Sequence, residues 1–240
     1  MKLKVLGSGS KGNSYILEGE NETLLLEAGI SYKEILKGLD FKLDKVVGCL
    51  ITHEHKDHSR AIKDLTKNGI DIYTSGGTLH VLQFFNHRCH VISNQVQFKI
   101  GEFTILPFKT QHDCIEPLGF LIYHAEIGKL IFITDSYFCK YKFNNVNNVM
   151  IECNYSQDIL DRNIKQGFLP EVLAKRLMKS HFSLDHVKEF LGNININKCR
   201  NVILLHLSEG NSDARKFKTE IEKLTGLPTY IADKNLEIDL

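Results

Sequence analysis

The feature that most constrains this chain is a histidine-rich segment placed directly after an apolar run. The run Val46–Ile51 has the length and the β-branched content of a buried strand. It leads straight into Thr52–His58, which reads Thr-His-Glu-His-Lys-Asp-His. Side chains of an extended chain alternate between two sides, so His53 and His55 point the same way. We expect a helix to begin where this motif ends.

Imidazole and carboxylate groups at this spacing are ligands for zinc and similar ions. His53 and His55 converge on one point, and Asp57 and His58 turn with the expected helix toward a second point nearby. Two metal ions held close together can activate water for attack on an ester or phosphoryl centre. A solvated charged loop is the alternative, and three His and one Asp within six positions argue against it.

A pair of metal ions needs more ligands than one loop supplies, so further His or Asp residues are expected at the ends of strands. Taken singly, each such residue is more often a surface group or a satisfied core side chain. Together they fit the edge at which open sheets collect their sites. They are His112 after Phe103–Phe108, Asp135 after Leu130–Thr134, and His206 after Val202–Leu205.

The order of the expected elements favours one α/β domain, residues 1–240, with two packed sheets and helices outside them. No linker or repeat interrupts the chain. Strands are expected at Lys2–Leu6, Ser14–Leu17, Thr23–Glu27, Val46–Thr52, Asp71–Thr74, Gln95–Phe108, Gly119–His124, Lys129–Thr134 and Val202–Leu205. Helices are expected at Tyr32–Gly38, Arg60–Gly69, Pro170–Lys179, Ser183–Leu191 and Ser212–Leu224, with Ser183 and Ser212 as N-caps and Gly192 and Gly226 as stops.

Composition limits the classes of partner. Thirty basic and 29 acidic residues give a formal net charge of +1, which argues against a surface built to hold long stretches of nucleic-acid backbone and leaves room for a local basic pocket. No apolar stretch approaches the ~20 residues that a bilayer needs. The six cysteines form no CxxC pair, which favours reduced thiols and a cytoplasmic location.

The order strand, His-x-His-x-Asp-His, later His, later Asp and last His resembles the metallo-β-lactamase superfamily of binuclear metallohydrolases over nearly the whole chain. The resemblance implies an αββα sandwich of two packed mixed sheets with outer helices. It also implies two divalent metal ions, zinc in the first place and manganese as the alternative. The implied ligands are His53, His55 and His112 for the first ion, Asp57, His58 and His206 for the second, and Asp135 as the bridge.

Two further segments narrow the resemblance to the phosphodiesterases with a ribonuclease Z-type fold. Leu6–Ser14, with its glycines and serines, resembles the opening of the YycJ/WalJ-like branch and of phage anti-Pycsar phosphodiesterases. Ser180–Ser183 resembles the histidine motif that contacts the scissile phosphate in the ribonuclease Z group. Leu205–Asn211 looks like the ending of the same branch, whereas Glu27 stands where an Asp is usual. The resemblance implies substrate contacts for Ser10, Asn13 and His181 and catalytic roles for Asp57 and His181.

The resemblance leaves two phosphodiesterase functions, and the small net charge favours the smaller substrate. The first is hydrolysis of cyclic mononucleotides such as cCMP and cUMP to linear nucleotides, as a phage counter-defence protein in the host-cell cytoplasm. The alternative is a YycJ/WalJ-like DNA exonuclease, with nucleic acid as the partner. Thioester hydrolysis uses nearly the same ligands and stays open, as does a homodimer. A β-lactamase and a metal-free scaffold are disfavoured, because the ligand set is complete and of the His/Asp type.

Overall fold

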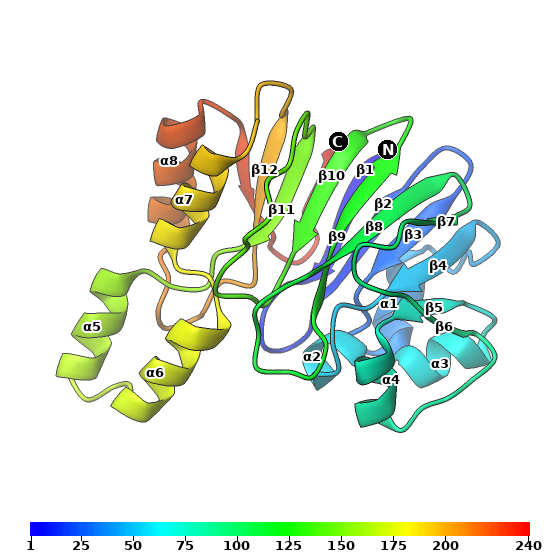
Figure 1. Ribbon diagram of the computed structural model, residues 1–240, viewed down its shortest axis with the longest axis horizontal. Helices are drawn as coiled ribbons and strands as arrows, with labels where there is room; N and C mark the ends of the chain where they lie inside the picture. Colours follow the sequence, from blue (N-terminus) through cyan, green and yellow to red (C-terminus); the bar gives the residue numbers. More distant parts are fainter. The chain divides into compact units, whose positions relative to one another are not determined.

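In the computed structural model, which describes residues 1–240, the chain divides into two units. Unit 1 holds residues 1–109, 114–128 and 232–240, and unit 2 holds residues 110–113 and 129–231. The last segment of the chain therefore returns to the unit that contains the first. There β14 (Glu237–Asp239) pairs antiparallel with β1 (Lys2–Gly7), so both termini lie on the same sheet (Figure 1).

Unit 1 is built on a sheet with the strand order β14-β1-β2-β3-β4-β5-β6. The strands β1 to β3 are antiparallel, whereas β3 to β6 are parallel. Parallel strands end at the same edge, so residues that follow β3 and β4 are brought to one place. The bounds are β2 (Ser14–Glu18), β3 (Thr23–Leu26), β4 (Val46–Leu50), β5 (Ile72–Thr74) and β6 (Cys89–Val91).

Four short helices and an antiparallel meander complete unit 1. The predicted helix Arg60–Gly69 is observed as the shorter α3, and a separate helix, α2, begins within the motif and ends before Arg60. The helix α4 was not predicted because it opens on two glycines, which are poor helix formers, and the cap Ser75 starts it by accepting from Thr78 N–H. The bounds are α1 (Tyr32–Gly38), α2 (Lys56–Ser59), α3 (Ile62–Lys67) and α4 (Gly76–Leu82), with β7 (Phe98–Ile100), β8 (Phe103–Lys109) and β9 (Leu118–His124) in the meander.

Unit 2 holds a parallel set of strands in the order β13-β12-β11-β10. The strand β11 was not predicted, because it starts on the asparagine-rich patch; Asn148 is buried there and accepts a 3.0 Å hydrogen bond from the amide of Asn201. The bounds are β10 (Gly128–Ile133), β11 (Asn148–Glu152), β12 (Asn201–Leu205), β13 (Thr229–Ile231), α5 (Gln157–Lys165), α6 (Glu171–Ser180), α7 (Leu184–Asn193) and α8 (Ala214–Thr225).

The predicted ends of two helices are partly wrong. Ser183 caps α7 by accepting from His186 N–H, and Gly226 ends α8 in the left-handed conformation, both as expected. The cap of α8 is Asp213 and not Ser212, since the Asp213 carboxylate reaches Lys216 N–H at 2.9 Å. Gly192 does not end α7. The helix continues to Asn193, and Ile194 is its C-cap.

Two expectations about the whole chain can be compared with the structure. None of its helices has the length and apolar character that a membrane crossing requires. None of the six cysteines forms a disulfide. The single domain over residues 1–240 stays a prediction.

The histidine motif is tied to the start of unit 1 by a close approach of backbone at Gly29. Asn13 N–H donates to the Asp57 carbonyl at 2.7 Å, and Gly29 N–H donates to the Asn13 carbonyl at 2.8 Å. Ala28 N–H also donates to the His58 carbonyl at 2.8 Å. A Cβ atom on Gly29 would lie 1.6 Å from the Asp57 carbonyl oxygen, so only glycine fits this position.

We predict that Gly29→Ala lowers the free energy of unfolding by on the order of 3 kcal/mol, because a methyl group forces the motif backbone away. Gly192→Ala is the matched control: its Cβ meets nothing within 4 Å, and alanine in a helix is expected to stabilise by about 0.5–1 kcal/mol. Urea unfolding followed by circular dichroism measures both changes. A Gly29→Ala protein as stable as the wild type would contradict this account of the motif.

Candidate metal centre

The side chains of the histidine motif converge as their alternation predicts. His53 is buried, and its Nε2 atom lies 3.1 Å from Nδ1 of His55. The hydroxyl of Thr52 lies 2.9 Å from the other ring nitrogen of His53. The His58 ring, on α2, lies 4.1 Å from the His53 ring between centroids. Three imidazoles are therefore gathered at the carboxyl end of β4.

Glu54 and Ser59 hold the motif in this shape. The Glu54 carboxylate accepts from Ile115 N–H at 2.9 Å and from the Thr78 hydroxyl at 3.4 Å, which joins the motif to α4 and to the loop before β9. The Ser59 hydroxyl donates to the carbonyls of Glu54 and His55 at 2.8 and 3.0 Å. The backbone that carries the two histidines is thus fixed from both sides.

The segment Leu6–Ser14, the glycine-rich segment, places Asn13 in contact with the histidine motif. Asn13 is fully buried, and its amide nitrogen lies 3.1 Å from both the Asp57 carbonyl oxygen and Nε2 of His58. Its amide oxygen accepts from Gly9 N–H at 2.9 Å. These contacts support the position of Asp57 and His58, and a substrate contact of Asn13 stays a prediction. Ser10, by contrast, is exposed.

Glu27, which replaces the usual Asp, reaches His58. It follows β3 directly, is fully buried, and has a left-handed backbone with φ of 63°. Its Oε2 atom lies 3.6 Å from Nδ1 of His58 and accepts from Thr52 N–H at 3.4 Å. Burial raises the pKa of the Glu27 carboxyl, against the lowering effect of His58. A carboxylate behind an imidazole orients the ring for a metal.

In unit 2, His112 is oriented in a way that suits a metal ligand. Its Nδ1–H donates to the Ser180 carbonyl at 2.9 Å, so in this tautomer Nε2 carries the lone pair. This Nε2 atom lies 3.7 Å from Oδ2 of Asp135, which lies two residues after the end of β10. Burial lowers the pKa of His112, against the opposing effect of Asp135, and so favours the neutral imidazole that binds metals.

His206 lies on the other side of Asp135. It follows β12 with φ of 51°, and its Nε2 atom is 3.8 Å from Oδ1 of Asp135. The amide of Asn154 donates to the His206 carbonyl at 2.9 Å and lies 3.1 Å from Nδ1 of the ring. A non-glycine residue in the left-handed region costs about 1–3 kcal/mol, and such strain persists where the surroundings fix it.

Glu152 is a site residue that the sequence analysis missed. It ends β11, is fully buried, and its Oε1 atom lies 2.6 Å from Nδ1 of His181. Its other oxygen accepts from Ser136 N–H and Phe182 N–H at 2.9 and 3.1 Å. An acid after an apolar run is the signal that identified Asp135, and it went unused here because β11 was not predicted.

The Glu152 carboxylate sets the charge of His181. Burial alone would lower the pKa of His181, but the negative charge of Glu152 and its hydrogen bond raise that pKa above its ordinary value. Burial would likewise raise the pKa of Glu152, and the His181 charge turns the shift downward. The ring of His181 stacks on that of His206, with centroids 5.6 Å apart. Asp135, Glu152, His181 and His206 each offer a ligand atom within 4.8 Å of the others.

Each unit thus brings its own predicted ligands together. Unit 1 gathers one set from the motif, and unit 2 gathers another around Asp135, with Glu152 and His181 beside it. Buried imidazoles anchored through one ring nitrogen, together with carboxylates, form donor sets that suit divalent cations. The sets are His53, His55, Asp57 and His58 in unit 1, and His112, Asp135 and His206 in unit 2.

Comparison with known proteins identifies the family. The family model described as a beta-lactamase superfamily domain matches residues 24–206, and the chain therefore belongs to this superfamily. Among solved structures, the metallo-beta-lactamase fold protein YhfI from Bacillus subtilis is similar, with a TM-score of 0.73 and 16% identity over 99% of each chain. The expected α/β fold of the metallo-β-lactamase type and the expected hydrolase are confirmed.

Two curated relatives cover most of the chain. Exodeoxyribonuclease WalJ of Streptococcus pneumoniae is 28% identical over 228 residues, which are 88% of this chain and 83% of that protein. Exodeoxyribonuclease YycJ of Bacillus anthracis is 25% identical over 233 residues, with 88% and 84% covered. Both names agree with the branch that the glycine-rich segment resembles.

We predict that Glu27→Gln weakens metal binding about 10–100-fold, because the neutral amide no longer holds the His58 ring through a charge. Competition with a chromophoric chelator measures the affinity. Glu171→Gln, at an exposed position of α6, is the matched control and is expected to bind metal as the wild type does. Equal affinity in the two variants would remove Glu27 from the support of the metal centre.

Proposed function

We propose that this protein is a metal-dependent phosphodiester hydrolase that shortens DNA from its ends. The Glu152–His181 pair beside Asp135 and His206 carries the proposal, because it adds an oriented imidazole to a metal-ligand set. The two exodeoxyribonuclease relatives, similar over most of the chain, support DNA as the substrate. Their names agree with the second of the two functions considered from the sequence.

The seven predicted ligands would hold two divalent metal ions, with zinc favoured by the His and Asp donors. When bound, these ions would supply a Lewis acid for the phosphoryl oxygens and lower the pKa of water at the site. Two observations support this ligand set. The His and Asp residues occur in the order that the superfamily resemblance implies, and the rings of His112 and His58 are held by Ser180 and Glu27 within their own units. Asp57 and His58 would contribute from α2 of unit 1, and Asp135 would contribute from unit 2.

The role of His181 follows from the contacts of its partner. Both oxygens of Glu152 accept hydrogen bonds from the protein, so we assign this carboxylate to orienting His181. Nδ1 of His181 is engaged with Glu152, which leaves Nε2 for the substrate. The raised pKa favours the protonated ring, and this proton can stabilise or reach the departing oxygen.

Hydrolysis of cyclic mononucleotides such as cCMP and cUMP is the second candidate, favoured by the formal net charge of +1. A small cyclic nucleotide fits within one pocket and requires no long basic surface. Under either candidate we place the protein in the cytoplasm, in keeping with its free thiols. The homodimer stays a prediction.

The two candidates separate in one assay. We expect the purified protein to contain about two metal ions per chain by elemental analysis, and to trim 5′-labelled DNA while leaving cCMP, cUMP, cAMP and cGMP intact. Removal of the metal by a chelator should abolish trimming, and added zinc or manganese should restore it. Hydrolysis of cyclic nucleotides with intact DNA would replace the first candidate by the second, and absence of any metal would refute both.

We predict that His181→Ala lowers kcat about 10²–10⁴-fold with unchanged metal content, as expected for the loss of a general acid or charge stabiliser. His87→Ala, at an exposed position outside the predicted ligand set, should match the wild type in both measurements. Loss of metal from the His181→Ala protein would make His181 a metal ligand instead of a residue that acts on the substrate.

A further inference from the structure

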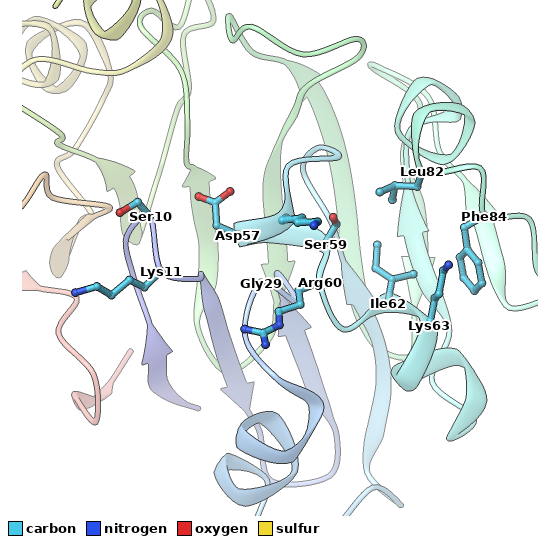
Figure 2. Close-up of a pocket in the computed structure, with 11 residues that line it drawn as sticks. Ser10, Lys11, Gly29, Asp57, Ser59, Arg60, Ile62, Lys63, Leu82 and Phe84 are labelled. Carbon is cyan, nitrogen blue, oxygen red and sulfur yellow. The ribbon is translucent and has the colours of Figure 1, made fainter. Parts of the chain in front are cut away.

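A cavity of about 610 Å³ lies in unit 1 against the histidine motif. Its volume is within the roughly 300–1,000 Å³ of pockets that enclose drug-sized ligands. Figure 2 shows Asp57 between Ser10 and Lys11 on one side and Lys63 and Phe84 on the other. The cavity therefore extends away from a predicted metal ligand along the surface of α2 and α3.

Positive charge is concentrated in this cavity. Lys11, Lys56, Arg60 and Lys63 line it, whereas the one acidic lining residue is Asp57, which belongs to the motif. Lys56 belongs to α2, Arg60 caps the end of that helix, and Lys63 belongs to α3, so the turn between the two helices brings all three to the cavity. All three are exposed, and none makes an ion pair within the protein. An anionic ligand would find several cations in a row here.

The far end of the cavity offers an aromatic ring. Phe84 is half-buried just after α4, and the Lys63 ammonium lies 5.7 Å from the centre of its ring. Leu82 and Ile62 form the apolar wall beside it. A basic groove combined with an aromatic ring is the arrangement that binds single strands, in which cations pair with phosphates and bases stack.

We infer that this cavity holds the nucleotides that flank the scissile phosphodiester of a single DNA strand. The inference rests on the proposed hydrolysis of DNA and names where the strand lies. A cyclic mononucleotide carries one phosphate, which would bind at the histidine motif. No second phosphate would then be left to pair with the basic residues of the cavity. A strand supplies one phosphate after another, and the near-zero charge of the whole chain does not oppose this, because the positive charge is local.

The test compares two pairs of substitutions that remove equal charge from unit 1. Arg60→Ala with Lys63→Ala changes the cavity, and Lys33→Ala with Lys37→Ala changes exposed positions of α1 that lie outside it. The probe is a fluorescent oligodeoxythymidylate with hydrolysis-resistant phosphorothioate linkages, and anisotropy measures its affinity at several salt concentrations. Circular dichroism checks folding, and Lys63→Ala alone is used if the double variant does not fold.

We expect the cavity pair to weaken binding roughly tenfold and to reduce the log–log salt slope by about 1.4, or about 0.7 for each lost phosphate contact. The α1 pair should leave the affinity and the salt slope close to those of the wild type. An equal effect of the two pairs, no effect of the cavity pair, or no binding by the wild type would overturn the inference.

Trimming of an unmodified strand by the wild type is measured separately. If the wild type trims the strand and the cavity pair binds the probe normally, only the inference about the cavity is refuted. Weakened binding by the cavity pair without any trimming by the wild type would refute the nuclease function alone.

Discussion

The contact between Gly29 and Asp57 is the constraint on which the predicted ligand loop depends. It brings three separate stretches of the chain into hydrogen-bonding distance: the glycine-rich segment, the turn after β3 and the histidine motif. The close approach fixes the backbone at Asp57 and His58, the two predicted ligands at the end of the motif. The glycine-rich segment therefore supports the ligands in addition to any part it plays toward a substrate.

The sequence was most informative where one apolar strand leads into polar residues. The run before His53 and the runs before His112, Asp135 and His206 predicted strand ends, and each of these residues follows a strand. Glu152 carries the same signal and was missed, because the asparagines before β11 concealed the strand. The partners Asn154 and Thr78 could not be predicted, since their contacts join segments far apart in the chain, and periodicity reports only on near neighbours.

Net charge is a weak guide to the size of a substrate, because it averages over the whole surface. Thirty basic and 29 acidic residues nearly cancel, yet the lining of one cavity holds four of the basic residues and a single acid. Three of these basic residues, Lys56, Arg60 and Lys63, come from α2, its C-cap and α3, which the turn between the helices brings to one cavity. A local surplus of this kind is invisible in composition and becomes apparent only when the fold is known.

The pairing of β14 with β1 has a consequence for how the protein is made. The strand β14 is the last element of the chain, and it covers one side of the first. During synthesis, one edge of β1 stays unpaired until residues 129–231 of unit 2 have been made, because residues 232–240, which include β14, come after them in the chain. Open edges invite pairing with other chains, and such distant contacts slow folding. In the nascent chain, this edge of β1 is therefore expected to stay open to such pairing until β14 has been made.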